Sequence, residues 1–315
     1  MNVDMDVPVD AGHVVGFYVD DDELTGTVSE YLGEALRDGG TAIVVATPEH
    51  RASLHQALSS DLSVGAVRQE GRYQSLDAAT CIRAFMRGRP DAAAFAARFE
   101  PVLAGAVGPV RVFGEMVALL WASGQVTEAI EVESLWNDLA SRLDFELFCA
   151  YPVSIIEGAG SLANGKRVCD QHARTIALGS EPLDVQIDRS QASCVFVPVA
   201  ATLPSVRRFV REVLLAWHFD AEVEVSALMG SELATNAILH ARSPFRVSIQ
   251  RDSSDITISV RDASMTLPAR RNPGPREVGG RGLGLISEMA DAWGTQQESD
   301  GKTVWATLAG RVPGS

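Results

Sequence analysis

Short β-rich runs and longer helical stretches alternate through the first half of the chain, from Val14 to about Leu178. Such alternation is typical of a parallel sheet whose strands are joined by crossover helices. We therefore predict an α/β amino-terminal domain with a mostly parallel sheet. The expected strands are 14–19, 41–46, 109–113 and 145–150, and the expected helices are 23–36, 48–58, 91–107 and 127–143.

A polar stretch at 179–191 separates this pattern from a different one. It lacks apolar periodicity and contains a proline, as exposed connections do. We place the domains at 1–182 and 194–312, with a linker at 183–193. The second domain is predicted as α+β, because two of its strands form a hairpin and its sheet is then at least partly antiparallel. Its expected strands are 194–198, 245–251, 255–260 and 303–308, with helices at 205–217 and 221–241 and a further helix that ends near Trp293.

Composition narrows the class of protein. The 315 residues, 46% hydrophobic and 22% charged, suffice for about two domains. The longest apolar runs are far shorter than a membrane span, and residues 1–10 carry three aspartates and no basic residue, unlike a secretory signal. We expect a soluble cytoplasmic protein.

Charge and cysteine content exclude further classes. The net charge of -14 repels a nucleic-acid backbone, so any effect on genes is expected to pass through a protein partner. The four cysteines, Cys81, Cys149, Cys169 and Cys194, form no C-x-x-C pair and are interpreted as buried, reduced residues.

Glu232 and Asn236 stand out on the expected helix at 221–241. They lie four residues apart, on one face beside the apolar stripe. The amide oxygen of Asn236 suits Mg²⁺, and Glu232 could act as a general base. Alternatively, both residues lie at the edge of the buried stripe and have no further role.

Two further segments are weak signals when taken singly. Asp262 follows a β-rich run, where an aspartate can accept a hydrogen bond from the exocyclic amine of adenine or simply begin a turn. The run 279–286, GGRGLGLI, opens an apolar helix and can wrap phosphate, or it can be a hinge. The loop before it carries Arg270, Arg271 and Arg276, as a phosphate-covering lid or a solvated basic loop does.

The order of these segments resembles the GHKL ATPase superfamily. SELATNAILHA is similar to its N box, VRDAS to its first glycine box and GGRGLGLI to its second, while GKTVWATL is similar to the last strand of the anti-sigma-factor serine/threonine kinases. The resemblance implies helices on one face of a mixed sheet, bound ATP and Mg²⁺, and a partner of anti-anti-sigma or sigma-factor type. It also implies roles for single residues: Glu232 as base, Asn236 as metal ligand, and Asp262, Ser264, Gly280, Arg281, Gly282, Leu283, Gly284, Lys302 and Thr303 in nucleotide binding.

Residues of the first half resemble the MEDS sensory domain, which is similar in architecture to RecA and KaiC ATPases without a working phosphate loop. GHVVGFYVDDDEL, PVRVFGEMVALLWASG and EVESLWNDLASRLDFELFCAYPVS carry the likeness. The run 160–167 matches G-x-x-x-x-G-K but ends in Arg167, where a hydroxyl should bind Mg²⁺, so it is interpreted as a coincidental loop. His13, Tyr18 and Glu115 flank expected strands and are candidates to line a small-molecule pocket, or are satisfied polar groups.

These resemblances predict a signalling regulator whose sensory domain controls the kinase domain. Two other functions remain open, and so does assembly into a homodimer. One alternative is a non-catalytic module whose partner affinity changes with the bound nucleotide. The other is an atypical histidine kinase with His172 as acceptor, although CDQHARTI lacks the Glu and Pro expected around such a residue. We interpret His172 as structural, and His240 as a residue that caps or packs.

Overall fold

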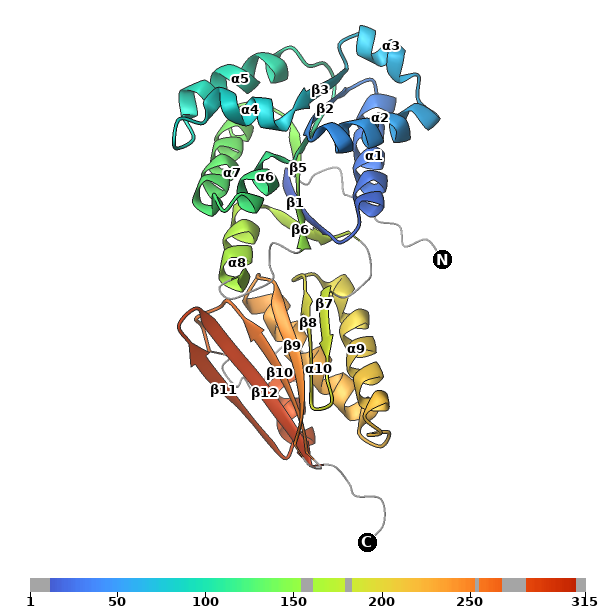
Figure 1. The fold of residues 1–315 in the computed structure, drawn as a ribbon, viewed down its shortest axis with the longest axis vertical. Coiled ribbons are helices and arrows are strands. Elements are labelled where there is room, and N and C mark those ends of the chain that lie inside the picture. Colours follow the sequence, from blue (N-terminus) through green and yellow to red (C-terminus); the bar gives the residue numbers. More distant parts are fainter. Residues whose placement is uncertain (1–11, 154–160, 179–182, 253–254, 268–281, 310–315) are drawn as a thin grey trace, which may run out of the picture. The chain divides into compact units, whose positions relative to one another are not determined.

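The structure is a computed structural model, and it describes residues 12–153, 161–178, 183–252, 255–267 and 282–309 (Figure 1). The chain divides into two compact units. The first comprises Met1–Ile155 with Val168–Gly179, and the second comprises Ile156–Arg167 with Ser180–Ser315.

The first unit is built on a six-stranded sheet in which every neighbouring pair is parallel, in the order β3-β2-β4-β5-β1-β6. All six residues of β1 and of β2 are buried, as expected for strands covered on both faces. The strands are β1 (His13–Tyr18), β2 (Thr41–Ala46), β3 (Tyr73–Asp77), β4 (Val110–Gly114), β5 (Glu146–Pro152) and β6 (Arg174–Ala177).

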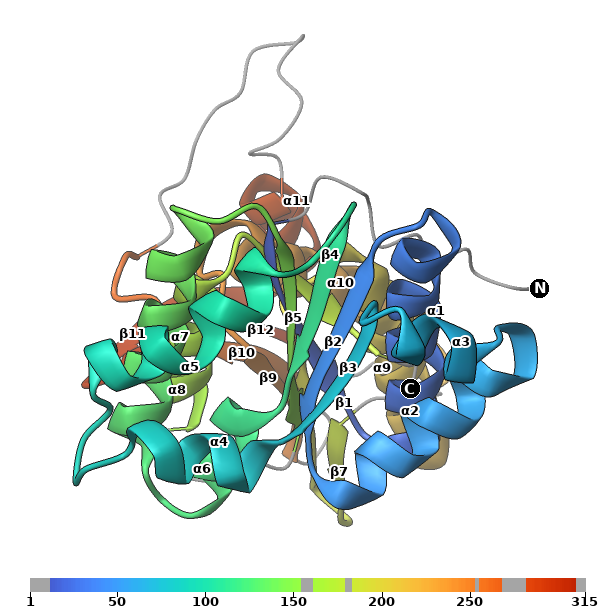
Figure 2. The same ribbon diagram turned by 90° about the horizontal axis from the view of Figure 1, so that it is seen from above.

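Helices cover both faces of this sheet. In Figure 2, α1 and α2 lie on one side of the strands and α4 to α7 on the other. Carboxylate or hydroxyl caps fix several starts: Asp20 accepts from the first turn of α1, and Thr47 and Asp77 do so for α2 and α4. The helices are α1 (Asp21–Arg37), α2 (Pro48–Asp61), α3 (Val64–Gln69), α4 (Ala78–Phe85), α5 (Ala92–Ala104), α6 (Met116–Ala122), α7 (Val126–Ala140) and α8 (Ser161–Gln171).

The second unit has a six-stranded sheet in the order β11-β12-β10-β9-β8-β7, and every neighbouring pair is antiparallel. Burial alternates along β10 and β12, and the buried residues form one core with the helices. The helices therefore cover one face of the sheet. The elements are β7 (Leu183–Ile187), β8 (Gln191–Phe196), α9 (Leu203–Ala216), α10 (Val223–His240), β9 (Phe245–Asp252), β10 (Asp255–Asp262), α11 (Gly282–Met289), β11 (Ala292–Glu298) and β12 (Gly301–Ala309).

The predicted fold class, α/β followed by α+β, is confirmed, with local corrections. The expected linker at 183–193 contains β7 and the start of β8, because its few apolar residues pair across a hairpin. The second sheet is antiparallel throughout its described pairs rather than mixed. The last helix ends at Met289, not near Trp293, because residues 292–298 pair with β12.

The run 160–167 also differs from the expected loop. Gly165 and Lys166 lie inside α8, where backbone N–H groups are engaged within the helix, and Gly160 lies outside the described residues. This position does not suit a phosphate loop. Among the described helices, none is both long and apolar enough to cross a membrane.

Candidate functional site

Two polar side chains on α10 lie at the edge of the second core, and no residue in the described part of the chain forms a hydrogen bond with the carboxylate of the first or with Nδ2 of the second. Glu232 and Asn236 are half-buried and one turn apart. The Nδ2 atom of Asn236 is buried and has no hydrogen-bond partner in the structure. A buried amide left unsatisfied costs about 1–3 kcal/mol, so it marks a position where a further partner is expected.

The start of α11 lies directly against these two side chains. A Cβ atom placed on Gly282 would stand 2.8 Å from Oε2 of Glu232 and 3.9 Å from Nδ2 of Asn236. Leu283 and Ile286 are buried in the core and hold α11 in this position. Around Gly284 a Cβ would meet no atom within 4 Å. The structure thus brings the carboxylate, the amide and the glycine-rich helix start together.

The end of β10 forms a second part of the site. Asp262 is 2% exposed, and its Oδ1 atom accepts from the Nζ of Lys302 at 2.8 Å and from the backbone N–H of Ser264 at 2.8 Å. Burial raises the pKa of Asp262 above its ordinary value, although Lys302, the Ser264 N–H and the charge of His240 each act to lower it. His240 follows Asn236 by one turn, so this end of α10 and the end of β10 are close in space.

Gly301 allows the close approach of β12 to this corner. A Cβ atom there would lie 2.0 Å from the carbonyl oxygen of Asp262 and 3.0 Å from the Cα of Ala263. The next turn is fixed by Ser243, which is fully buried and whose Oγ accepts the N–H of Ala263 at 3.1 Å. Sequence reasoning missed Ser243 because it lies twenty residues away with no motif of its own.

Not every predicted nucleotide-binding residue belongs to this arrangement. Thr303 follows Lys302 on β12 and therefore points to the opposite face, where its Oγ1 donates to Glu298 at 2.5 Å. Gly280 and Arg281 lie outside the described residues, as do Arg270, Arg271 and Arg276.

The residues expected to line a pocket in the first unit separate into two places. Tyr18 and Glu115 are both at carboxyl ends of strands and meet at His50, whose Nδ1 lies 2.7 Å from Oε1 of Glu115. His13 is at the opposite end of β1, beside Glu133 and His172. The three residues therefore do not line one pocket, because a strand places its first and last residues at opposite edges of the sheet, and His13 and Glu115 match the alternative of buried polar groups with partners.

Comparison with family models gives each unit a relative. Residues 12–163 match the MEthanogen/methylotroph, DcmR Sensory domain (MEDS), and residues 196–308 match the histidine kinase-like ATPase domain. The chain carries a MEDS domain followed by a histidine kinase-like ATPase domain. In the search of the curated proteins, none matches this chain. The ATPase-domain match spans Glu232, Asn236, Asp262, Gly282 and Lys302, so the geometry above is that of an ATPase module in a signalling regulator.

Proposed function

We propose that the histidine kinase-like ATPase domain binds ATP with Mg²⁺ and transfers a phosphoryl group to a serine or threonine of a protein partner of anti-anti-sigma type, under control of the MEDS domain. The observation that supports this most is the close approach of the start of α11, at Gly282, to Glu232 and Asn236, whose buried Nδ2 has no hydrogen-bond partner among the described residues.

The donor set fits a magnesium nucleotide. The oxygen and nitrogen of a side-chain amide exchange places by a flip, so the unsatisfied amide of Asn236 can present its oxygen to a metal ion. Mg²⁺ takes one or two protein oxygens along with phosphates and water. When bound, it would neutralise charge on the phosphates.

The corner at Asp262 fits the base of the nucleotide. Both hydrogen bonds to this carboxylate that the described residues make go to Oδ1, so Oδ2 can accept from an exocyclic amine. Ser264, which stands where the GHKL pattern often has glycine, turns its N–H toward the same carboxylate rather than blocking it. Lys302 holds that carboxylate in place and reaches a ligand only through it.

Glu232 is the group that can take a proton from the attacking hydroxyl. In the described part of the chain its carboxylate has no hydrogen-bond partner, and it lies one turn from Asn236 on the same face. Positioned bases of this kind contribute about 10²- to 10⁴-fold to a rate.

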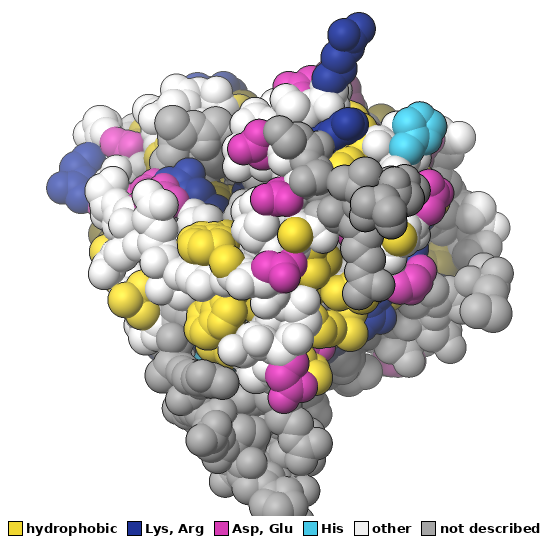
Figure 3. Space-filling view, turned by 90° about the horizontal axis from the view of Figure 1, so that it is seen from below, with side chains coloured by type: hydrophobic (Ala, Val, Ile, Leu, Met, Phe, Trp, Pro, Cys, Tyr) yellow, Lys and Arg dark blue, Asp and Glu magenta, His cyan; other side chains and the backbone are white. Residues whose placement is uncertain are grey.

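A protein partner suits the surface better than nucleic acid does. On the face shown in Figure 3, acidic and hydrophobic side chains lie among one another, with several basic side chains toward one side. The net charge of the whole chain, -14, disfavours a phosphate backbone as partner.

The decisive experiment compares ATP binding with phosphoryl transfer in matched variants. The full chain is incubated with labelled ATP, Mg²⁺ and candidate anti-anti-sigma partners. We expect Glu232→Ala to keep ATP affinity within about threefold and to lose at least about 100-fold in transfer. We expect Asn236→Ala to lose at least about tenfold in Mg²⁺-dependent affinity, or about 1.4 kcal/mol.

Thr235→Ala is the matched control on the same helix. The hydroxyl of Thr235 donates to the carbonyl of Ser231 within α10, so binding and transfer should both be unchanged. Equal behaviour of the Glu232 and Asn236 variants in calorimetry and transfer would contradict the separate roles. Absence of transfer to every partner, with tight ATP binding intact, would instead favour the non-catalytic module.

The structure disfavours the histidine kinase alternative. The side chain of His172 is fully buried against Glu133 and cannot be reached by a nucleotide without local unfolding. Label that survives acid but not base identifies phosphoserine or phosphothreonine, whereas acid-labile label on this chain would support a phosphohistidine.

A further inference from the structure

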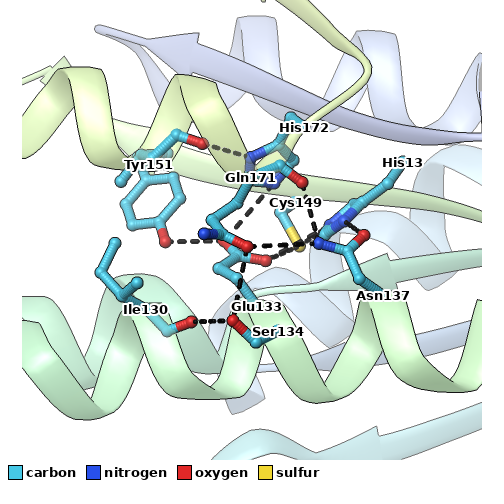
Figure 4. A network of polar contacts seen from close by, with 10 residues as sticks. His13, Ile130, Glu133, Ser134, Asn137, Cys149, Tyr151, Gln171 and His172 are labelled. Carbon is cyan, nitrogen blue, oxygen red and sulfur yellow. Dashed lines mark hydrogen bonds and ion pairs between the residues drawn. The ribbon is translucent and has the colours of Figure 1, made fainter.

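A cluster of four side chains that can bind a metal ion lies in the interior of the first unit. His13 comes from β1, Glu133 from α7, Cys149 from β5, and His172 follows α8 (Figure 4). Their ligand atoms all lie within 4.8 Å of one another. The side chains are between 0 and 5% exposed, so bulk water has no access to the space between them.

Each of the two histidines forms a hydrogen bond through Nδ1 to an oxygen outside the cluster, and this leaves Nε2 as the nitrogen that faces the cluster. The Nδ2 of Asn137 donates to the carbonyl of Gln171 at 2.9 Å, which turns Oδ1 of Asn137 toward Nδ1 of His13 at 2.8 Å. Nδ1 of His172 lies 2.7 Å from the carbonyl oxygen of Val168. Because each Nδ1 faces an oxygen acceptor, it carries a proton, and in the neutral tautomer each ring presents the Nε2 lone pair to the cluster.

These lone pairs converge on other electron-rich atoms. Nε2 of His13 lies 3.3 Å from Oε2 of Glu133, and Nε2 of His172 lies 3.4 Å from Oε1 of the same carboxylate. Nε2 of His172 is buried without a hydrogen-bond partner. The Cys149 thiol and the Tyr151 hydroxyl donate to the Glu133 carboxylate, but neither of them satisfies Nε2 of His172, and a cation among these acceptors would.

The spacing fits the edges of a tetrahedron around one metal ion. Zinc bonds of about 2.0–2.3 Å to nitrogen, oxygen and sulfur place neighbouring ligands about 3.3–3.6 Å apart. The Sγ of Cys149 lies 3.2 Å from Nε2 of His13 and 3.4 Å from Oε2 of Glu133. With the 3.3 Å from Oε2 of Glu133 to Nε2 of His13, the three edges among these three atoms lie within about 0.4 Å of this expectation, and His172 approaches the other oxygen of the same carboxylate at 3.4 Å.

We propose that His13, Glu133, Cys149 and His172 form a closed binding site for one divalent transition-metal ion of the zinc type. A thiolate and a carboxylate balance the double positive charge, so the buried site is neutral as a whole. Binding replaces the thiol proton of Cys149, which passes to solvent. Two nitrogens, one sulfur and one oxygen are a borderline-soft set that suits Zn²⁺ or Co²⁺ and not Mg²⁺ or Ca²⁺.

Neighbouring groups complete the site as an outer shell. Asn137 orients His13, and the hydroxyl of Tyr151 donates to Oε1 of Glu133 at 2.7 Å. Four protein ligands leave no open position, as in structural rather than catalytic zinc sites. The ion would therefore join β1, α7, β5 and the residue after α8, and its presence or absence is a signal that a sensory domain can use.

The competing occupant of the same space is a proton. With the histidines protonated, the cluster would be a buried ion-pair network around Glu133, and metal would not bind. In that protonated network burial acts to raise the pKa of Glu133, but the charge and hydrogen bonds of His172 and His13 outweigh burial and hold this pKa well below its ordinary range. An ionised carboxylate at Glu133 is compatible with either occupant.

The test uses the full chain, first assayed for metal content and then titrated with Co²⁺ after removal of metal. We expect about one ion per chain, the ligand-field bands of tetrahedral Co²⁺ and a thiolate-to-cobalt charge-transfer band. Cys149→Ala should abolish the charge-transfer band. Cys81→Ala is the matched control, because Cys81 is equally buried and free but lies on α4, and it should keep the band.

Folding of each variant is followed by circular dichroism. If Cys149→Ala does not fold, Asn137→Ala decides, because it removes an outer-shell contact and should weaken Co²⁺ binding about 10- to 100-fold while keeping the band at saturation. Folded wild-type protein that takes up no metal overturns the proposal in favour of the protonated network. An octahedral Co²⁺ spectrum, or a charge-transfer band that survives in folded Cys149→Ala, overturns it as well.

Discussion

Replacement of Lys302 by methionine should destabilise the ATPase domain by about 3–4 kcal/mol at pH 7. Lys302 and Asp262 are 3% and 2% exposed and 2.8 Å apart. Removal of one partner from a buried pair leaves the other charge uncompensated, which costs about 3–5 kcal/mol. Methionine keeps most of the volume of lysine, so the effect reports charge and not a cavity.

Protonation of Asp262 sets an upper limit to this cost. A pH of 7 is about 3.2 units above the ordinary pKa of an aspartate, 3.8. At 1.36 kcal/mol per unit, protonating the carboxylate at this pH costs about 4.4 kcal/mol. At pH 5 the same limit is about 1.6 kcal/mol. In the variant the folded pKa of Asp262 lies above the unfolded value, so the folded state binds more protons and stability falls as pH rises.

Urea unfolding of the full chain at pH 5 and pH 7 measures the difference. Lys166→Met in α8 is the matched control, because Lys166 is the other lysine of the chain and is only half-buried, and it should cost less than about 1 kcal/mol. Adding Asp262→Asn to Lys302→Met should restore much of the stability. The reasoning is refuted if the two lysine variants behave alike, or if the loss at Lys302 is independent of pH.

Three further changes test separate contacts. Gly301→Ala should lower the free energy of unfolding by about 1–3 kcal/mol, because its Cβ would lie 2.0 Å from the carbonyl oxygen of Asp262. Gly26→Ala is its control and should raise the free energy of unfolding by about 0.5–1 kcal/mol, because Gly26 lies in α1 with open space around its Cβ position. Similar urea midpoints for the two variants would contradict this. Gly282→Ala should fold normally, because the added methyl group would press only on the movable end of the Glu232 side chain. It should slow phosphoryl transfer about tenfold or more by displacing the Glu232 carboxylate. Unchanged transfer would argue against that carboxylate as the base. His50→Gln should cost about 1–2 kcal/mol at pH 6 and progressively less at higher pH, measured by unfolding at pH 6 and 8.5.

The sign of the His50 effect follows from its partner. The hydrogen bond to Glu115 raises the pKa of His50 above 6.5, against the lowering effect of burial, and the charges of Glu115 and Asp21 add to the increase. The stabilisation is therefore complete below about pH 6.5 and is lost as pH rises through the raised value. A difference between His50→Gln and wild type that does not change with pH would contradict this linkage.

Local sequence was sufficient wherever a pattern is continuous. The expected strands at 41–46 and 245–251 and the helices at 205–217 and 221–241 correspond to β2, β9, α9 and α10 within a few residues. Periodicity of apolar residues fixes which face of each element is buried, independent of distant parts of the chain. Short elements with polar residues on exposed faces, such as β3, β7 and β11, lacked that signal and were missed.

The sequence by itself determined the α/β and α+β units and the order of motifs that places Glu232, Asn236, Asp262 and Gly282 in one ATPase domain. Only the tertiary structure decided which side chains meet. Lys302 pairs with Asp262, and Thr303 points to the opposite face of β12. The side chains that converge in the first unit are His13, Glu133, Cys149 and His172. The last four are separated by up to 159 positions and lie on different elements, so no spacing rule links them. Their proximity depends on sheet order and helix packing, which long-range contacts create and local patterns do not encode.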